Sequence, residues 1–249
     1  MRANILLPAA ALLALSTAGY AAETSWRDIE SRIQYGYYTE DVPALRSLAG
    51  LIAADESHDK LHGYYAALLN WRLAQLAAQG VSREAPAAAM VERCVSAADD
   101  ALAAQADFAD ALALRAACQG TPIPATDHGL FSGHRRLHRD LERARQLSPH
   151  DPRVLLVDAM NDYQLPRSAG GNKERALPKL RLAVAAFEAE RAGLERLPGW
   201  GAAEAYLFLA RELLDHGDAI AARDALEHAL LIAPEFAQAR RLMAKIIAG

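Results

Sequence analysis

The sequence has 249 residues, of which 52% are hydrophobic, 23% charged and 6% aromatic. Its net charge is −4, so it lacks the basic excess that draws proteins to nucleic acid or to anionic lipid, and no nucleic-acid partner is expected. The chain is long enough to bury a large core, and its abundant alanine, the best helix former, favours closely packed helices.

The N-terminus has the pattern of a secretory signal peptide. One basic residue, Arg2, precedes a nearly continuous apolar stretch at 5–15, and the small residues Gly19 and Ala21 occupy the −3 and −1 positions of a cleavage site. The apolar stretch is shorter than the ~20 residues that span a bilayer, although an uncleaved anchor is the alternative. We therefore predict a signal peptide at 1–21, a mature chain without a membrane span, and a periplasmic or secreted location.

Helical patterns follow one another along the rest of the chain, and no stretch has the pattern of a strand. A first helix is expected around residues 26–33, and a second begins after Thr39, which is a suitable N-cap. A third helix over 59–79 is apolar on nearly all sides, as expected of a helix buried between neighbours in a solenoid. The sequence therefore predicts an all-α fold in one domain over 22–249.

The segment 203–236 is the clearest copy of an internal unit and has the pattern of a helical hairpin. Apolar residues recur at helical spacing, the pattern stops at Gly217, and a second helical run ends at Pro234. The segment resembles the tetratricopeptide repeat (TPR) family. The residues that match the family pattern are Tyr206 in the tryptophan position, Leu209 and Ala210, Leu213, Ala222, Leu226 and Pro234.

The joints between hairpins also recur along the sequence. Segments 101–111, 144–154 and 229–239 align without gaps, and their spacing corresponds to one and two units of about 43 residues. This unit exceeds the ~34 residues of the family pattern, so turn-rich insertions are expected at 119–133 and 165–172.

The resemblance implies a right-handed superhelical α-solenoid of about ten helices in three to five TPR-like hairpins. The N-terminal helices would cap one end, and a capping helix at 237–247 would close the other. Segments 151–154, 170–173 and 198–201 resemble exported bacterial TPR-like proteins and, more loosely, the periplasmic TPR component of tripartite carboxylate transporters.

The family's usual role is binding other proteins in a concave groove lined by the first helix of each hairpin. The resemblance implies a non-enzymatic scaffold of the bacterial cell envelope, without a cofactor, that binds a protein or peptide there. Counted by the family pattern, the groove residues are Arg153, Leu156, Met160, Glu204, Leu207, Arg211, Gln238, Arg241 and Lys245. The cations among them favour an acidic or carboxylate-bearing segment. The alternative is a small-molecule or metal-binding auxiliary of a periplasmic transport system.

Catalytic motifs are not apparent in the sequence, and no catalytic residue is predicted. The histidines suggest metal binding as an alternative. His58 and His62, and again His134 and His138, are four residues apart and share a helix face that could bind a transition metal. Neither pair is completed by a nearby cysteine, and two arginines lie between the second pair, so surface histidines are the preferred interpretation.

The cysteines Cys94 and Cys118 are the only two in the chain. They lie equally far on either side of the joint at Ala106, so two antiparallel helices would bring them to the same level. In an oxidising compartment this position favours a disulfide, and two buried free thiols are the alternative.

Overall fold

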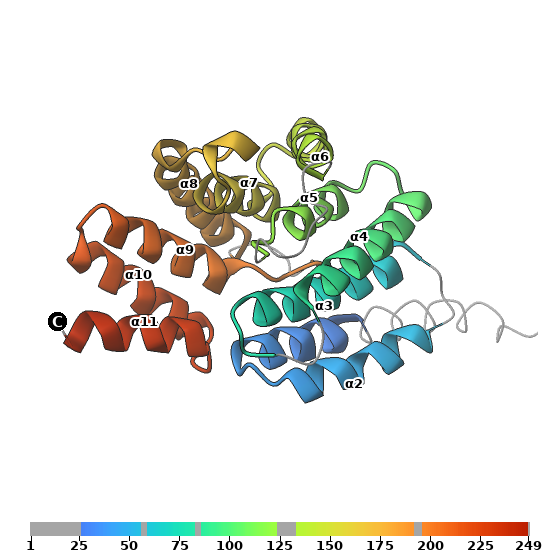
Figure 1. Cartoon of the computed structure of the whole chain (residues 1–249), viewed down its shortest axis with the longest axis horizontal. Coiled ribbons are helices and arrows are strands. Elements are labelled where there is room, and N and C mark those ends of the chain that lie inside the picture. The colour runs from blue at the N-terminus through green and yellow to red at the C-terminus, as the bar shows by residue number, and fades with distance from the viewer. Residues whose placement is uncertain (1–25, 56–58, 83–85, 124–132, 192–195, 249) are drawn as a thin grey trace, which may run out of the picture.

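The computed structural model describes residues 26–55, 59–82, 86–123, 133–191 and 196–248, and every regular element in these ranges is a helix (Figure 1). The first helix covers residues 26–38. The elements that follow are α2 (Val42–Ala53), α3 (Lys60–Ala78), α4 (Ala87–Ala104), α5 (Ala109–Gln119), α6 (Gly133–Leu147), α7 (Pro152–Gln164), the short 3-10 helix η2 (Arg167–Ala169), α8 (Lys173–Arg191), α9 (Ala202–Asp215), α10 (Ala219–Ile232) and α11 (Ala237–Ala248). The predicted all-α fold is confirmed.

Consecutive helices pack in pairs, α3 with α4, α5 with α6, α7 with α8 and α9 with α10, and the pairs stack into a right-handed α-solenoid of TPR-like hairpins (Figure 1). The last helix, α11, packs on α10 where the capping helix was expected. The predicted signal peptide at 1–21 lies outside the described residues. None of the described helices has the length and apolar character needed to span a membrane.

The joints between hairpins have the same backbone geometry. The amide of Phe108 donates to the carbonyl of Gln105 (3.2 Å), and the amide of Phe236 donates to the carbonyl of Ala233 at the aligned positions (3.0 Å). The joint before α7 has the equivalent hydrogen bond, from the amide of Asp151 to the carbonyl of Ser148 (3.2 Å). The sequence similarity of the three segments therefore reflects one repeated turn that reverses the chain between hairpins.

The second helix begins later than the sequence indicated. The side chain of Asp41 accepts a hydrogen bond from the amide of Ala44 (2.9 Å) and is the N-cap of α2. The Thr39 hydroxyl instead donates to the carbonyl of Tyr35 (2.8 Å) at the end of the first helix. Thr39 and Asp41 are both good capping residues, and the turn between the two helices decides which of them caps.

Small residues let neighbouring helices approach closely. A Cβ atom at Gly63 of α3 would lie 2.6 Å from the backbone nitrogen of Ala101 and 2.8 Å from the carbonyl oxygen of Ala97, both in α4. A side chain at this position is therefore incompatible with the observed packing of α3 on α4.

The two ends of the solenoid meet. The ring of Tyr38, at the end of the first helix, lies 4.5 Å from the ring of Phe236 in the joint before α11. The guanidinium of Arg241 in α11 donates to Glu40 (2.9 Å). The N-terminal helices were expected to cap one end only, but the first helix also contacts the opposite end of the repeat array.

Candidate functional site

The face that the family pattern assigns to a groove is lined with a buried network of ion pairs and hydrogen bonds. Arg72 of α3 forms an ion pair with Glu204 of α9, and their side chains are 0% and 2% exposed. Gln34 and Tyr38 of the first helix both donate to Glu204, at 3.2 and 2.8 Å. The carboxylate of Glu204 therefore joins α9 to both α3 and the first helix.

Aromatic rings surround the Arg72 guanidinium. The centre of the guanidinium lies 4.1 Å from the ring centroid of Tyr37, 4.6 Å from that of Trp71 and 5.0 Å from that of Trp200. These distances are within the range of cation–π attraction, which is strongest where water is excluded. Arg72 is thus held by both charge and aromatic contacts.

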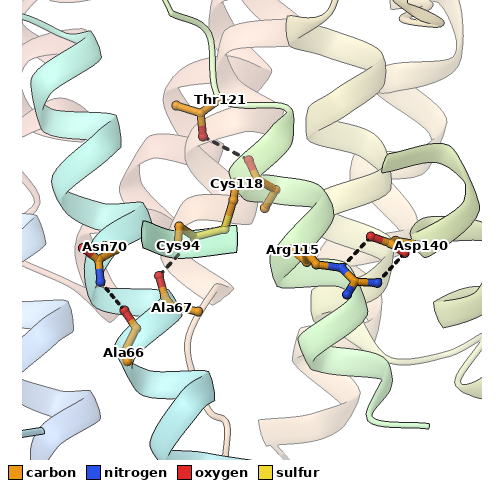
Figure 2. Close-up of a disulfide and its surroundings, with 9 residues drawn as sticks. Ala66, Ala67, Asn70, Cys94, Arg115, Cys118, Thr121 and Asp140 are labelled. Carbon is orange, nitrogen blue, oxygen red and sulfur yellow. Dashed lines mark hydrogen bonds and ion pairs between the residues drawn. A yellow bond between two sulfur atoms is a disulfide. The ribbon is translucent and has the colours of Figure 1, made fainter. Parts of the chain in front are cut away.

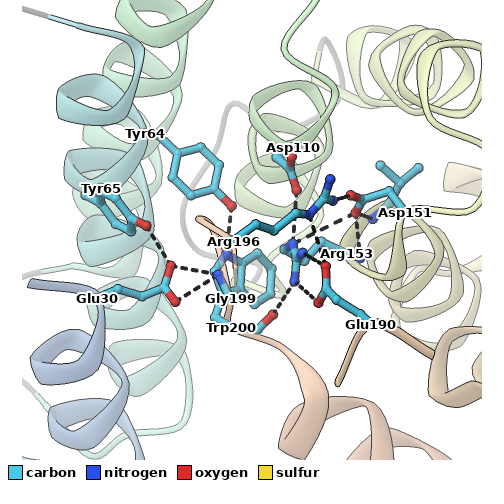
Figure 3. Close-up of polar contacts among 11 residues, drawn as sticks. Glu30, Tyr64, Tyr65, Asp110, Asp151, Arg153, Glu190, Arg196, Gly199 and Trp200 are labelled. Atoms are coloured by element: carbon cyan, nitrogen blue, oxygen red, sulfur yellow. Dashed lines mark hydrogen bonds and ion pairs between the residues drawn. The ribbon is translucent and has the colours of Figure 1, made fainter. Parts of the chain in front are cut away.

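A second buried network centres on Arg153 of α7 (Figure 3). Its guanidinium donates to Asp110 (3.0 Å), to Glu190 (3.0 Å) and to the backbone carbonyl of Trp200 (3.3 Å). Burial, reinforced by the negative charge of Asp151, raises the pKa of Asp110 to about 6. Burial disfavours the charged form of Arg153, but its carboxylate partners outweigh this cost and raise its pKa.

The first helix is also tied to the segment that leads into α9. Both carboxylate oxygens of Glu30 accept from the amide of Gly199, at 2.9 and 3.0 Å, and one accepts from the hydroxyl of Tyr65 (2.8 Å) (Figure 3). Burial raises the pKa of Glu30 despite these hydrogen bonds. The indole of the adjacent Trp200 donates to the hydroxyl of Tyr64 (2.7 Å). The 198–201 segment is therefore anchored to α3 and to the first helix.

The structure separates the predicted groove residues into two groups. The buried group contacts the chain itself and comprises Arg153, Leu156, Met160, Glu204, Leu207 and Gln238. Arg211 is half-buried, whereas Arg241 and Lys245 on α11 are exposed. The first helix fills much of the space expected for a partner. Its Gln34 and Tyr38 donate to the carboxylate of Glu204, and its Tyr37 accepts from the amide of Gln238. Only Arg211, Arg241 and Lys245 are placed to meet an external ligand.

A cavity of about 170 Å³ opens beside Arg211. Its wall is formed by the first helix, α3, the segment that follows α5, α7, α9 and α11, so it lies where the two ends of the solenoid meet. The lining residues are Tyr37, Trp71, Gln75, Ala78, Gln79, Thr121, Pro122, Gln164, Phe208, Arg211 and Gln238. The wall thus combines aromatic rings, amide side chains and a single cation.

A second hollow, of about 960 Å³, lies between the joint before α7 and one face of α8. Its floor is largely apolar and includes Leu155 and the exposed Leu182. The charged residues at its rim are already paired, since Arg196 contacts both Asp151 and Glu190. Among the described residues, this hollow therefore presents apolar surface, and its acidic and arginine side chains are paired with one another.

The cysteines come together between α4 and α5 (Figure 2). Cys94 and Cys118 form a disulfide with Cα atoms 6.0 Å apart. One turn away, Arg115 of α5 donates to both carboxylate oxygens of Asp140 in α6, at 2.8 and 2.7 Å. Covalent and ionic contacts therefore link three successive helices at this level.

The histidines of the two pairs that the structure describes are engaged in other contacts. His62 is hydrogen-bonded through Nε2 to the carbonyl of Ile52 (3.0 Å), and His138 through Nε2 to that of Ala169 (3.0 Å). His58 lies outside the described residues. Within the described ranges, no group of three or more His, Cys, Asp or Glu side chains is placed to hold a metal ion.

Sequence reasoning missed Arg72 and Glu30, which help to hold the ends of the solenoid together. Arg72 lies in the helix predicted to be apolar on nearly all sides, and an arginine within such a helix is itself a signal of a buried ion pair. For Glu30, the sequence contains no comparable signal, because its partner Gly199 contributes only a backbone amide.

Comparison with known proteins agrees with this architecture. No protein-family model matches the sequence, and no curated protein is significantly similar to it. The fold is similar to that of TTC0263, a TPR protein of Thermus thermophilus, with a TM-score of 0.58 and 13% identity over 89% of this chain and 100% of that one. It is also similar to the HusA haemophore from Porphyromonas gingivalis, with a TM-score of 0.57 and 21% identity over 78% of this chain and 93% of that one. The chain therefore has a TPR-like helical-repeat fold.

Proposed function

We propose that this protein is a non-enzymatic binding scaffold of the bacterial cell envelope that holds an acidic or carboxylate-bearing protein segment. Its TPR-like hairpins offer the extended surface that solenoid proteins use for partners. A haemophore among the structures of similar fold supports a binding role outside the cytoplasm.

The single observation that carries the proposal is the charge of α11. This helix exposes Arg240, Arg241 and Lys245 and contains no acidic residue. Arg240 contacts the exposed Glu235, and Arg241 contacts Glu40, whose side chain is 16% exposed. Ion pairs in which the arginine is open to solvent contribute little, so a partner's carboxylates can compete for both arginines. The proposed partner surface is therefore α11, continued by Arg211 at the mouth of the cavity.

The envelope location rests on two observations. The sequence has a signal-peptide pattern at 1–21, and the structure contains a disulfide, which persists in oxidising compartments. Both are compatible with a periplasmic or a secreted protein.

The alternative function is that of an auxiliary of a transport system, which would bind either a small molecule or a metal. One observation favours the small-molecule version. The cavity at Arg211 is partly open, and its lining is polar enough to hold a small ligand. Its 170 Å³ is below the ~300–1,000 Å³ of pockets for drug-sized ligands, so a large planar group such as a haem does not fit it. The metal-binding form has no comparable support in the described residues.

Affinity capture from an envelope extract tests the scaffold. The native protein is compared with a variant carrying Arg241→Glu and Lys245→Glu, which reverses the charge of α11. The control carries Arg181→Glu and Arg223→Glu, which make the same change in net charge on exposed positions of α8 and α10. We expect the α11 variant to lose an acidic partner that the control retains. Identical partners for all three proteins would exclude α11 as the binding surface.

A further inference from the structure

Arg211 differs from the other arginines of the interior in what surrounds its charge. Arg72, Arg115 and Arg153 each contact at least one carboxylate. Arg211 donates to the amide oxygen of Gln238 (2.9 Å) and lies over the ring of Phe208 (5.1 Å), and no carboxylate contacts it among the residues the structure describes.

The charge of Arg211 is only partly compensated by its neighbours. Burial lowers the pKa of Arg211, because a half-buried cation has lost part of its hydration. A guanidinium carries five N–H donors, and one hydrogen bond to a neutral amide compensates for only part of that loss. An anion beside Arg211 would supply the missing counter-charge.

The adjacent cavity limits the size of such an anion. Its volume of about 170 Å³ is close to the ~150 Å³ of an engineered cavity that accommodates benzene. A ligand of roughly six to ten non-hydrogen atoms would fill this space.

The cavity wall also indicates the chemistry of the ligand. The planar guanidinium of Arg211 matches the two oxygens of a carboxylate. The amides of Gln75, Gln79 and Gln164 can bond to further hydroxyl, carbonyl or amino groups, and the rings of Trp71 and Phe208 offer apolar surface. The wall therefore suits a short carbon skeleton with one end ionised.

We propose that this cavity binds a small organic carboxylate, paired with Arg211 and enclosed by Trp71, Phe208 and the glutamine side chains. The inference goes beyond the scaffold function because the ligand is a free small molecule and needs no partner protein. Since Tyr37, Arg211 and Gln238 come from opposite ends of the solenoid, the ligand would also stabilise the contact between those ends.

The test uses the purified mature protein and four pairs of acid and amide. The pairs are lactate with lactamide, succinate with succinamide, glutarate with glutaramide, and benzoate with benzamide. Thermal unfolding and isothermal titration measure binding, and a change in the tryptophan fluorescence, to which Trp71 contributes, reports on the cavity. We expect at least one acid to raise the melting temperature and to bind, while its amide does neither. If no acid binds, or if amides bind as tightly as acids, the proposal is wrong.

Two variants locate the site. Arg211→Gln removes the cation and should weaken binding of the acid by about tenfold or more, whereas Arg223→Gln, at an exposed paired cation of α10, should leave binding unchanged. Ala78→Met fills the cavity while retaining Arg211, and it should also abolish binding. Unchanged affinity in both Arg211→Gln and Ala78→Met would place the ligand elsewhere and overturn the proposal.

A capped tripeptide with a central glutamate distinguishes a free ligand from a partner's side chain. Binding of this peptide without binding of any free acid would assign the carboxylate to the partner segment and overturn the small-molecule site. Binding of a free acid together with failure of the α11 capture experiment would support the cavity site and reject the scaffold.

Discussion

Arg72 and Glu204 form an ion pair that is almost completely removed from water, between α3 in the first half of the solenoid and α9 in the second. The residues are far apart in sequence, yet this contact, together with Gln34 and Tyr38, joins the ends of the repeat array. Such a pair is costly to break, because either partner left alone is a buried, uncompensated charge.

The first prediction concerns this ion pair. Arg72→Met or Glu204→Leu alone should lower the free energy of unfolding by about 3–5 kcal/mol, and the double variant should lose less than the two single losses added together. Urea denaturation of the four proteins measures the coupling. Additive losses would show that the two charges do not depend on each other.

The second prediction concerns pH. The pKa of Asp110 is raised to about 6, while an unfolded aspartate titrates near ~3.9. The folded protein therefore holds this proton more tightly. The associated stability is fully present below the unfolded pKa and is lost as pH rises through about 6.

The Asp110→Asn variant removes this dependence. The unfolding free energy of the native protein minus that of the variant should fall by on the order of 2 kcal/mol between pH 4 and pH 7. Urea denaturation across that range measures the difference. Asp107→Asn, at an exposed position of the same joint, controls for the loss of one carboxylate. A difference that rises with pH would contradict the prediction.

The third prediction concerns the disulfide. Protein produced in an oxidising compartment and unfolded without reductant should have no thiol that reacts in titration, because Cys94 and Cys118 are bonded. Cys94→Ala with Cys118→Ala should lower the unfolding free energy by about 3 kcal/mol, since a loop of this length restricts the unfolded chain. Two reactive thiols per chain would show that the pair is reduced.

The fourth prediction concerns the packing of α3 on α4. Gly63→Ala should lower the unfolding free energy by about 1–3 kcal/mol, because its Cβ would press on backbone atoms of Ala97 and Ala101. Gly50→Ala is the matched control, since Gly50 lies on the exposed face of α2 and a Cβ there meets no atom within 4 Å. We expect Gly50→Ala to stabilise the protein by about 0.5–1 kcal/mol. If both variants behave alike, the close contact at Gly63 is relieved by a small shift of α4.

The fifth prediction concerns metal ions. Zinc or copper should leave the melting temperature unchanged, because no group of three or more His, Cys, Asp or Glu side chains among the described residues is placed to hold a metal ion. Thermal unfolding with and without each metal checks this. If the metal raises the melting temperature and His134→Ala or His138→Ala removes that rise, the prediction is wrong and these histidines bind the metal.

The sequence by itself determined the repeated part of the fold. Helical periodicity in 203–236, Gly217 at the turn and the aligned joints at 101–111 and 229–239 specify hairpins that stack on their neighbours. Each of these features acts over a few residues or between adjacent hairpins, so the sequence pattern records it directly. The equal distance of Cys94 and Cys118 from the joint between their helices is also a local feature. In the structure their Cα atoms are 6.0 Å apart.

Only the tertiary structure decided what the concave face contains. Periodicity shows which side of a helix is buried but not whether the buried contact is a neighbouring helix or one from the far end of the chain. That depends on the small rotation between successive hairpins, which accumulates along the solenoid and is not encoded in any single repeat. It brings Tyr37 to Gln238 and Gln34 to Glu204, so the first helix fills most of the expected groove and Arg211 is left beside a small cavity.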